Sequence, residues 1–234
     1  MSNTAREPVL NVPAPIVVMV AVLLGVHIWA SLASPYQQYV AIHRFGFVPA
    51  RLADAAWGFE AALMWISYAF LHGSWSHLGF NSLWLLIFGT PVLRRIGLAR
   101  FIVLCIIGSI SAVGLHLAIY WDDPRPVIGA SGVVSALTGA AARFAFAPHG
   151  RPGVSHRGPT LSIAQTLTSR GPLVFVAVWM IANVVMGAGL IGGSGAPSVA
   201  WEAHIGGFLA GLLTFSAFDR QSMNRSDPSG SSSR

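Results

Sequence analysis

Three short clusters of polar residues interrupt a chain that is otherwise strongly apolar. They are Gly129-Ala130-Ser131-Gly132, then Glu202-Ala203-His204 with Gly207 and Gly211 behind it, and the stretch from His72 to Asn81 that contains His77. A serine is a potential nucleophile and a histidine a potential base. Histidine and asparagine side chains can donate hydrogen bonds to a developing oxyanion. Such a set of groups has the chemistry of acyl transfer.

The first cluster opens an unusually short apolar stretch. From Ser131 that stretch reaches Ala142 before Arg143, which is 12 residues, whereas a membrane-spanning helix needs about 20. The helix should therefore begin below the membrane surface, with the segment before it buried in protein or facing a wet cavity. Ser131 would lie at a helix N-terminus, where free backbone N–H groups can bind an oxyanion. The alternative is a serine that only caps the helix.

Two glycines give the second cluster a smooth helix face. Gly207 and Gly211 are four residues apart, so another helix can pack closely on them. His204 lies one turn before Gly207, near enough to this face to meet a neighbouring helix. The alternative is a histidine whose hydrogen bonds serve packing alone.

The third cluster places two donors on one helix face. If a helix starts near Ser76, His77 and Asn81 are i and i+4 and stack at its outer end. They could bind an oxyanion, or they could hydrogen-bond the loop backbone. We assign His72 to loop structure.

Composition indicates a chain whose solvent is mostly lipid. Of 234 residues, 54% are hydrophobic and 9% are charged, with a mean hydropathy of +0.63, whereas soluble domains carry about 25% charged residues. All 14 basic residues are Arg, spread singly or in pairs between apolar segments, which is typical of topogenic charge and argues against nucleic acid. Cys105 is the single cysteine and should be a buried apolar side chain. With no second cysteine and no His-Glu-x-x-His, we expect no metal site.

Hydropathy predicts an all-α polytopic membrane protein with six spans. The spans are 15–34, 77–93, 100–121, 130–147, 172–192 and 203–218. The first could instead be a signal peptide, since it ends in Ala-Ser-Leu-Ala-Ser. It is nearly of full span length, so we expect a retained helix. The predicted organisation is a short cytoplasmic segment over 1–14, a membrane domain over 15–218 and a disordered tail over 219–234.

The distribution of Arg predicts that both termini are cytoplasmic. Eleven Arg fall on the inner side and three on the outer side, as the positive-inside rule requires. Ser131, His204, His77 and Asn81 then all map to the outer half of the membrane. The loop over 35–76 should fold at the interface, and 148–171 should be an ordinary cytoplasmic loop. The inner Arg are Arg6, Arg94, Arg95, Arg100, Arg143, Arg151, Arg157, Arg170, Arg220, Arg225 and Arg234, and the outer are Arg44, Arg51 and Arg125.

Over residues 67 to 218 the chain resembles the rhomboid family of intramembrane serine proteases. The resemblance is carried by Ser67 to His77 running on to Asn81, by Gly-Ala-Ser131-Gly, and by Ala203-His204 with Gly207 and Gly211. It implies a six-helix bundle with a Ser–His dyad and no cofactor. Ser131 is then the nucleophile, and His204 is the base that later protonates the leaving amine. The oxyanion hole comprises the Ser131 backbone N–H, His77 and Asn81. The implied substrates are transmembrane segments of single-span or polytopic proteins, cleaved within the lipid bilayer.

Two positions depart from the family pattern. Leu63-Met64 stands where many members have Trp-Arg, and Ser135 stands where many have an aromatic ring that stacks on the histidine. Either another group holds the His204 ring, or the ring is held less firmly. Glu202, two residues away, points elsewhere on a helix. By family analogy the loop over 189–198 acts as a lid.

Two other functions compete with proteolysis. A non-catalytic relative would bind membrane clients without cutting them, but such relatives usually lack the serine or the histidine. A transporter or channel would spread polar residues through the depth of the bundle, whereas these gather at one level. The Arg-only, Ala- and Gly-rich composition suits a bacterial plasma membrane, with the active site open to the outer face.

Overall fold

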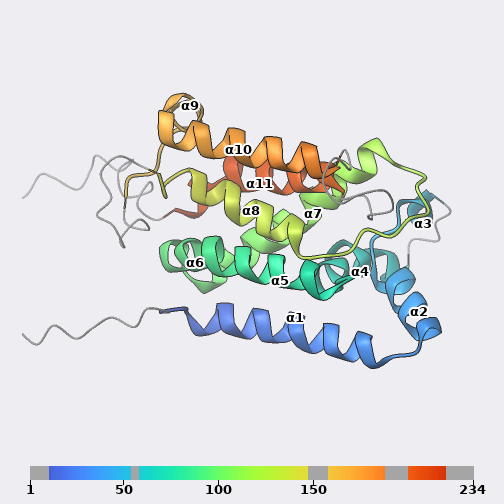
Figure 1. Cartoon of the computed structure of the whole chain (residues 1–234). Coiled ribbons are helices and arrows are strands. Elements are labelled where there is room, and N and C mark those ends of the chain that lie inside the picture. The colour runs from blue at the N-terminus through green and yellow to red at the C-terminus, as the bar shows by residue number, and fades with distance from the viewer. Residues whose placement is uncertain (1–10, 54–57, 147–157, 188–199, 220–234) are drawn as a thin grey trace, which may run out of the picture.

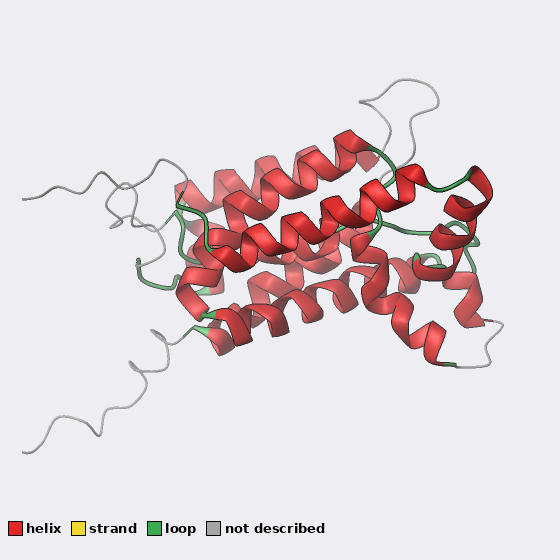
Figure 2. Cartoon of the chain, turned by 90° about the horizontal axis from the view of Figure 1, so that it is seen from below, coloured by secondary structure: helices red, strands yellow, loops and turns green. Residues whose placement is uncertain are grey.

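The regular structure is helical throughout the part of the chain that can be described. The computed structural model describes residues 11–53, 58–146, 158–187 and 200–219, and within them β pairing is limited to one isolated antiparallel bridge between Phe47 and Val127. Figure 2 shows long helices lying side by side and shorter ones at one end. The predicted all-α class is confirmed.

The long helices form a bundle, and the first and last of them have their outer ends at the same end of it. Helix α1 begins and α11 ends at the left of Figure 1, which we call the terminal end. The helices of the bundle are α1 (Ala14–Leu32), α5 (Trp75–Trp84), α6 (Thr90–Ile96), α7 (Leu98–Ile119), α8 (Ser131–Ala142), α10 (Arg170–Gly187) and α11 (Trp201–Phe218).

The opposite end, which we call the loop end, is built from short helices. They are α2 (Pro35–Phe45), α3 (Pro49–Ala53), α4 (Phe59–Ser67) and the single 3₁₀ turn η1 (Tyr68–Phe70), and they lie at the right of Figure 1. An ion pair of 2.7 Å between Arg44 and Glu60 joins α2 to α4. The described part of the long loop over 35–76, predicted to fold at the membrane interface, is therefore largely helical.

Each of the six predicted spans overlaps a helix in its described part, but the number of crossings stays a prediction. Among the described residues, only α1 and α7 are long and apolar enough to cross a membrane by themselves. The predicted span 77–93 is divided into α5, a π-helical segment η2 (Leu85–Gly89) and α6. Helix α8 has only 12 residues, and α11 begins with the polar Glu202 and His204.

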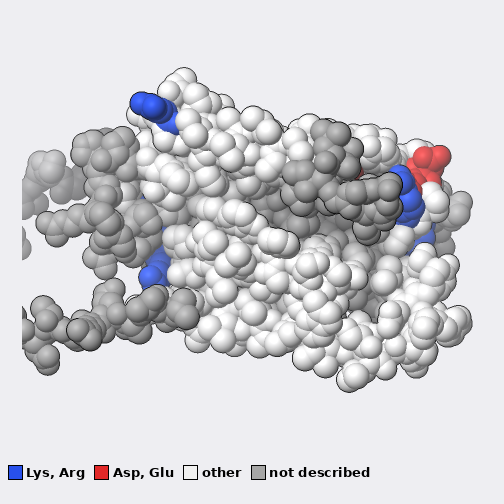
Figure 3. Space-filling model, in the orientation of Figure 1, with Lys and Arg blue, Asp and Glu red and all other residues white. Residues whose placement is uncertain are grey.

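The surface of the bundle is suited to lipid. Large apolar side chains face outward along the helices, among them Val18 (59% exposed), Ile181 (63%) and Leu213 (55%). The charged side chains seen in Figure 3 gather near the two ends of the molecule. A broad apolar surface of this kind is rare on soluble monomers and marks contact with a membrane or a partner.

Helix α8 is the centre of the bundle. Every residue from Gly132 to Ala142 is buried, and most of them are small. A Cβ on Gly139 would overlap the backbone of Phe208 in α11, and one on Gly108 in α7 would overlap Ala136. Small residues let these three backbones approach closely, which is how helices associate in a membrane.

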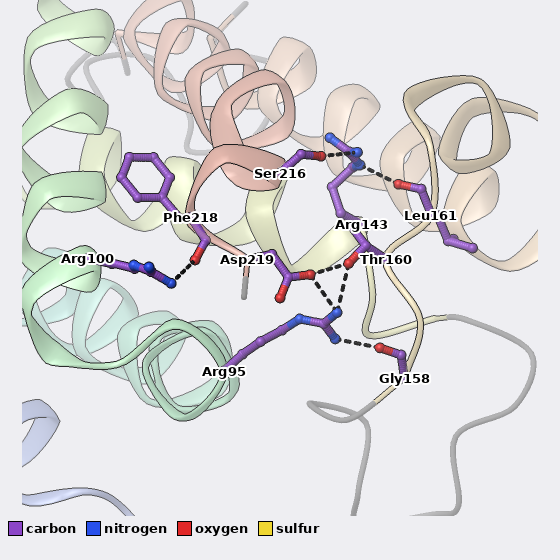
Figure 4. Close-up of polar contacts among 9 residues, drawn as sticks. All are labelled: Arg95, Arg100, Arg143, Gly158, Thr160, Leu161, Ser216, Phe218 and Asp219. Atoms are coloured by element: carbon purple, nitrogen blue, oxygen red, sulfur yellow. Dashed lines mark hydrogen bonds and ion pairs between the residues drawn. The ribbon is translucent and has the colours of Figure 1, made fainter. Parts of the chain in front are cut away.

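A buried polar network closes the terminal end (Figure 4). The Arg95 guanidinium of α6 lies 2.7 Å from the Asp219 carboxylate at the end of α11, and it also donates to the Gly158 carbonyl and to Thr160. Thr160 in turn donates to Asp219. Arg143, at the end of α8, donates to the Leu161 and Leu212 carbonyls and to Ser216.

This network differs from the sequence expectation for the loop and the tail. The described part of the loop over 148–171 packs on the bundle and continues into α9 (Ile163–Thr168). Asp219, the first residue of the predicted tail, is fully buried. The rest of the tail, the predicted lid over 189–198, most of the N-terminal segment and residues 147–157 lie outside the described residues.

Candidate active site

The segment that leads into Ser131 is fastened residue by residue to the loop end. Phe47 and Val127 exchange two backbone hydrogen bonds of 2.9 and 2.8 Å, and the Gly129 N–H donates to the Tyr68 carbonyl at 2.9 Å. The Ala130 N–H approaches His72 Nε2 at 3.5 Å. Gly129 adopts a φ of +120°, a conformation that L side chains rarely take. These contacts fix where α8 begins.

Ser131 is the first residue of α8 and does not cap it. The N-cap is Ala130, and no side chain caps the helix. Among the described residues the Ser131 N–H donates to no acceptor, and the Ser131 side chain is half-buried. Figure 1 shows that the helix starts inside the bundle rather than at its end. The interpretation of Ser131 as a mere cap therefore does not apply.

His77 and Asn81 face the turn that precedes Ser131. Ser74 caps α5, and its hydroxyl accepts from the His77 N–H at 3.1 Å. A Cβ placed on Gly129 would lie 2.6 Å from His77 Nε2 and 3.6 Å from Asn81 Nδ2. Asn81 is 5% exposed, and its Nδ2 has no hydrogen-bond partner among the described residues. A buried amide donor without a partner costs free energy, which makes it available to an incoming acceptor.

The glycine face of α11 rests on α8. A Cβ on Gly207 would overlap the Gly132 backbone, and one on Gly211 would overlap the Ala136 carbonyl. From the first contact to the second, the residue number rises by four on α11 and by four on α8, so the two helices run parallel. His204, one turn before Gly207, then stands beside the end of α8 that carries Ser131. The prediction that these two glycines face a neighbouring helix agrees with these contacts.

Ser131 and His204 are near each other in register but not hydrogen-bonded. Within the described part of the chain, no hydrogen bond joins the two side chains. Catalytic hydrogen bonds are often long before substrate binds and shorten in the complex. The register of the two helices places His204 beside the start of α8, without a hydrogen bond to Ser131.

The sequence reasoning missed Asn183, which contacts the His204 ring. Its Oδ1 lies 2.5 Å from His204 Nδ1, and its side chain is 8% exposed on α10. A signal was available, because Asn183 is an isolated amide in the apolar run 172–192, and a polar group at membrane depth requires a partner or a function.

The His204 ring has no aromatic neighbour on α8, at the position where the sequence resemblance led us to look for one. Ser135 is buried on α8, and no aromatic ring among the described residues stacks on His204. One turn further along, Trp179 of α10 stacks on Phe208 of α11 with ring centroids 4.4 Å apart. The ring is thus approached from α10 rather than from α8.

Glu202 has a different partner from His204. Its Oε1 lies 2.6 Å from His116 Nδ1 of α7, and both side chains are buried. The expectation that Glu202 points elsewhere on the helix agrees with this contact. No three His, Cys, Asp or Glu side chains within the described residues group closely enough to hold a metal ion.

Comparison with known proteins gives one family throughout. The sequence model described as "Rhomboid domain" matches residues 60–220. Two similar curated proteins are the Rhomboid protease GlpG of Serratia proteamaculans (strain 568) and that of Yersinia pestis (strain Pestoides F). Each is 30% identical over 149 residues, which cover 64% of this chain and 45% of the relative. The chain therefore matches less than half the length of these relatives.

Proposed function

Because the chain belongs to the rhomboid family, we propose that it is an intramembrane serine endopeptidase that hydrolyses peptide bonds in transmembrane segments of membrane proteins. Ser131 is the nucleophile and His204 the base. The observation that carries the proposal is that three groups come together at the start of α8. They are the half-buried Ser131, the unpaired Asn81 amide and the end of α11 that carries His204. The proposal applies to the matched domain.

The reaction follows from the roles of these groups. His204 Nε2 takes the Ser131 hydroxyl proton while Oγ attacks the substrate carbonyl, which forms a tetrahedral oxyanion. The Ser131 N–H, Asn81 Nδ2 and His77 Nε2 donate to that oxyanion. The C–N bond then breaks, and His204 gives its proton to the leaving amine. Water, with His204 again as base, hydrolyses the acyl-enzyme and restores Ser131.

The setting of the reaction is also part of the proposal. Rhomboid proteins are integral membrane proteins, and the composition of this chain agrees with that. We infer six crossings from hydropathy, and a bacterial plasma membrane from the Arg-only, Ala- and Gly-rich composition. We infer cytoplasmic termini and an active site that opens to the outer face because eleven of fourteen Arg fall on the inner side. A peptide bond can enter only where a substrate helix unwinds, so we expect small residues at the cut and helix breakers beyond it.

The non-catalytic alternative is disfavoured by the site itself. A protein that only binds clients has no need of a serine at a helix N-terminus, directly after a turn that an unpaired buried amide faces. The transporter alternative is disfavoured because the candidate catalytic groups gather at one level of the bundle, and the buried polar groups at the terminal end bind one another and backbone carbonyls.

A cleavage assay tests the proposal directly. The purified chain is placed in liposomes with a single-span substrate that has small residues and a helix breaker in its span. We expect wild type to cut it, Ser131→Ala and His204→Ala to be inactive, and Ser135→Ala, a matched buried serine one turn away on α8, to remain active. Equal product from wild type and Ser131→Ala would exclude Ser131 as the nucleophile.

A further inference from the structure

We propose that Asn183 is a positioning residue that holds the His204 ring and fixes its tautomer, so that the catalytic unit is Ser131–His204–Asn183 rather than a dyad. The inference rests on the proposed function. It assigns a role to a residue outside the three motifs and accounts for the departure at Ser135. No contact of Asn183 with substrate is required, because it acts only through His204.

The orientation of the Asn183 amide is set by its own helix. Asn183 Nδ2 lies 2.7 Å from the Trp179 carbonyl one turn earlier in α10. A carbonyl oxygen only accepts, so the amide nitrogen must face it. The reverse orientation would place two acceptors in contact. The Oδ1 atom is therefore the one that faces His204.

This orientation determines where His204 carries its proton. Because Asn183 Oδ1 only accepts, His204 Nδ1 at 2.5 Å must be the N–H donor. In the neutral imidazole the other nitrogen, Nε2, then has the free lone pair. That is the form a general base needs toward Ser131. The carboxylate of a serine protease triad performs this same task, and a neutral amide does so without placing a charge in the membrane.

The helix pairing around the contact makes it rigid. One turn below the His204–Asn183 contact, Phe208 stacks on Trp179 at 4.4 Å. The two contacts join α10 and α11 at successive turns, since Asn183 and Trp179 are four apart and His204 and Phe208 are four apart. Asn183 and Phe208 are both buried, which limits the access of water to the Asn183 side of the contact. A ring fixed in this way does not need an aromatic neighbour on α8.

Kinetics of three variants separate positioning from packing. Asn183→Leu keeps the side-chain size but loses the acceptor, and we expect kcat/KM to fall about 100-fold, mostly in kcat, as a misplaced catalytic group does. Asn183→Asp restores an acceptor and should return to within about tenfold of wild type. Val184→Ala, the lipid-facing neighbour, should stay within about twofold. A folded Asn183→Leu as active as wild type, or a folded Asn183→Asp as inactive as Asn183→Leu, would overturn the proposal.

A spectroscopic test does not depend on activity. The ¹⁵N-histidine NMR spectrum of the Ser131→Ala protein, with the His204 signals assigned by their loss in His204→Gln, should show Nδ1 protonated. Trp179→Phe, which weakens the α10–α11 packing but keeps the amide, should leave this signature in place. A ring protonated at Nε2 alone in the unaltered Asn183 background would refute the proposal, whether or not Asn183→Leu folds. Failure of the proposed function would appear separately, as a wild-type protein that cuts no substrate.

Discussion

Gly207 of α11 lies against the Gly132 backbone of α8 so closely that a single added carbon would overlap it. This contact sets the register of the two helices that carry the candidate nucleophile and base. It is repeated one turn further on, where Gly211 meets the Ala136 carbonyl. The position of His204 relative to Ser131 therefore depends on the absence of two side chains.

Gly211→Val should separate α11 from α8. The obstructing atoms belong to the Ala136 backbone, which cannot rotate away, so we expect a loss of about 1–3 kcal/mol in the free energy of unfolding, as overpacking usually costs. Cleavage should fall with it. Thermal unfolding in detergent measures the effect.

The matched control is Gly25→Ala on α1, where an added Cβ meets nothing within 4 Å. Alanine favours a helix over glycine by about 1 kcal/mol, so this variant should be as stable as wild type or more so. A Gly211→Val protein that melts with wild type would show that the α8–α11 contact does not carry the packing.

Asn81→Ala tests the oxyanion hole. Its buried Nδ2 is unpaired, so removing the amide should not destabilise the fold through a lost protein hydrogen bond. The loss of one oxyanion donor typically lowers kcat by about 10² to 10³. We expect that decrease in steady-state cleavage, with KM little changed. Ser82→Ala, the next residue of α5, is the control, and equal activity of both variants would remove Asn81 from the site.

Asp219→Ala tests the network at the terminal end. Both charges of the Arg95–Asp219 pair are almost completely buried, and removing one partner of such a pair leaves the other uncompensated, at about 3–5 kcal/mol. The unfolding midpoint in denaturant should drop accordingly. The comparison is Glu60→Ala, which breaks an ion pair whose side chains are half exposed and should change stability by about 1 kcal/mol or less. If the two variants lost the same free energy of unfolding, the buried Arg95–Asp219 pair would matter no more to stability than the exposed pair.

Glu202→Ala tests whether this carboxylate acts on His204 or on α7. Its partner at 2.6 Å is His116, so we expect a lower melting temperature from the broken buried pair. The rate at which a fluorophosphonate probe labels Ser131, measured per folded molecule, should stay within about threefold of wild type. A loss of modification as deep as that of His204→Ala, in protein that remains folded, would instead assign Glu202 to the catalytic unit.

Patterns within one segment predicted much of the candidate site. The 12-residue apolar stretch from Ser131 to Ala142 correctly predicted a short helix that starts at the serine, and the spacing of Gly207 and Gly211 predicted a close helix contact. These features depend on length and periodicity alone. The same holds for His77 and Asn81, which share a face as soon as α5 begins where its cap allows.

Contacts between distant segments could not be predicted in the same way. Arg95 and Asp219 are paired although they are 124 residues apart. The charge count also took every Arg as a solvated group that sets the topology, whereas Arg95 and Arg143 are buried. The π-helical segment within the second predicted span leaves no mark in the hydropathy. The partner of Asn183 depends on which face α10 turns toward α11, and the sequence of either helix alone does not contain that information.

The most direct test of the central claim is covalent labelling of Ser131. The purified protein is incubated with a fluorophosphonate, and the adduct is located by intact mass and peptide mapping, which requires no knowledge of the natural substrate. We predict one adduct on Ser131 in wild type, none in Ser131→Ala, and a strongly reduced rate in His204→Ala because the base is missing. A folded wild-type protein that takes up no probe, or that takes it up equally without Ser131 or His204, would contradict the assignment of these two residues.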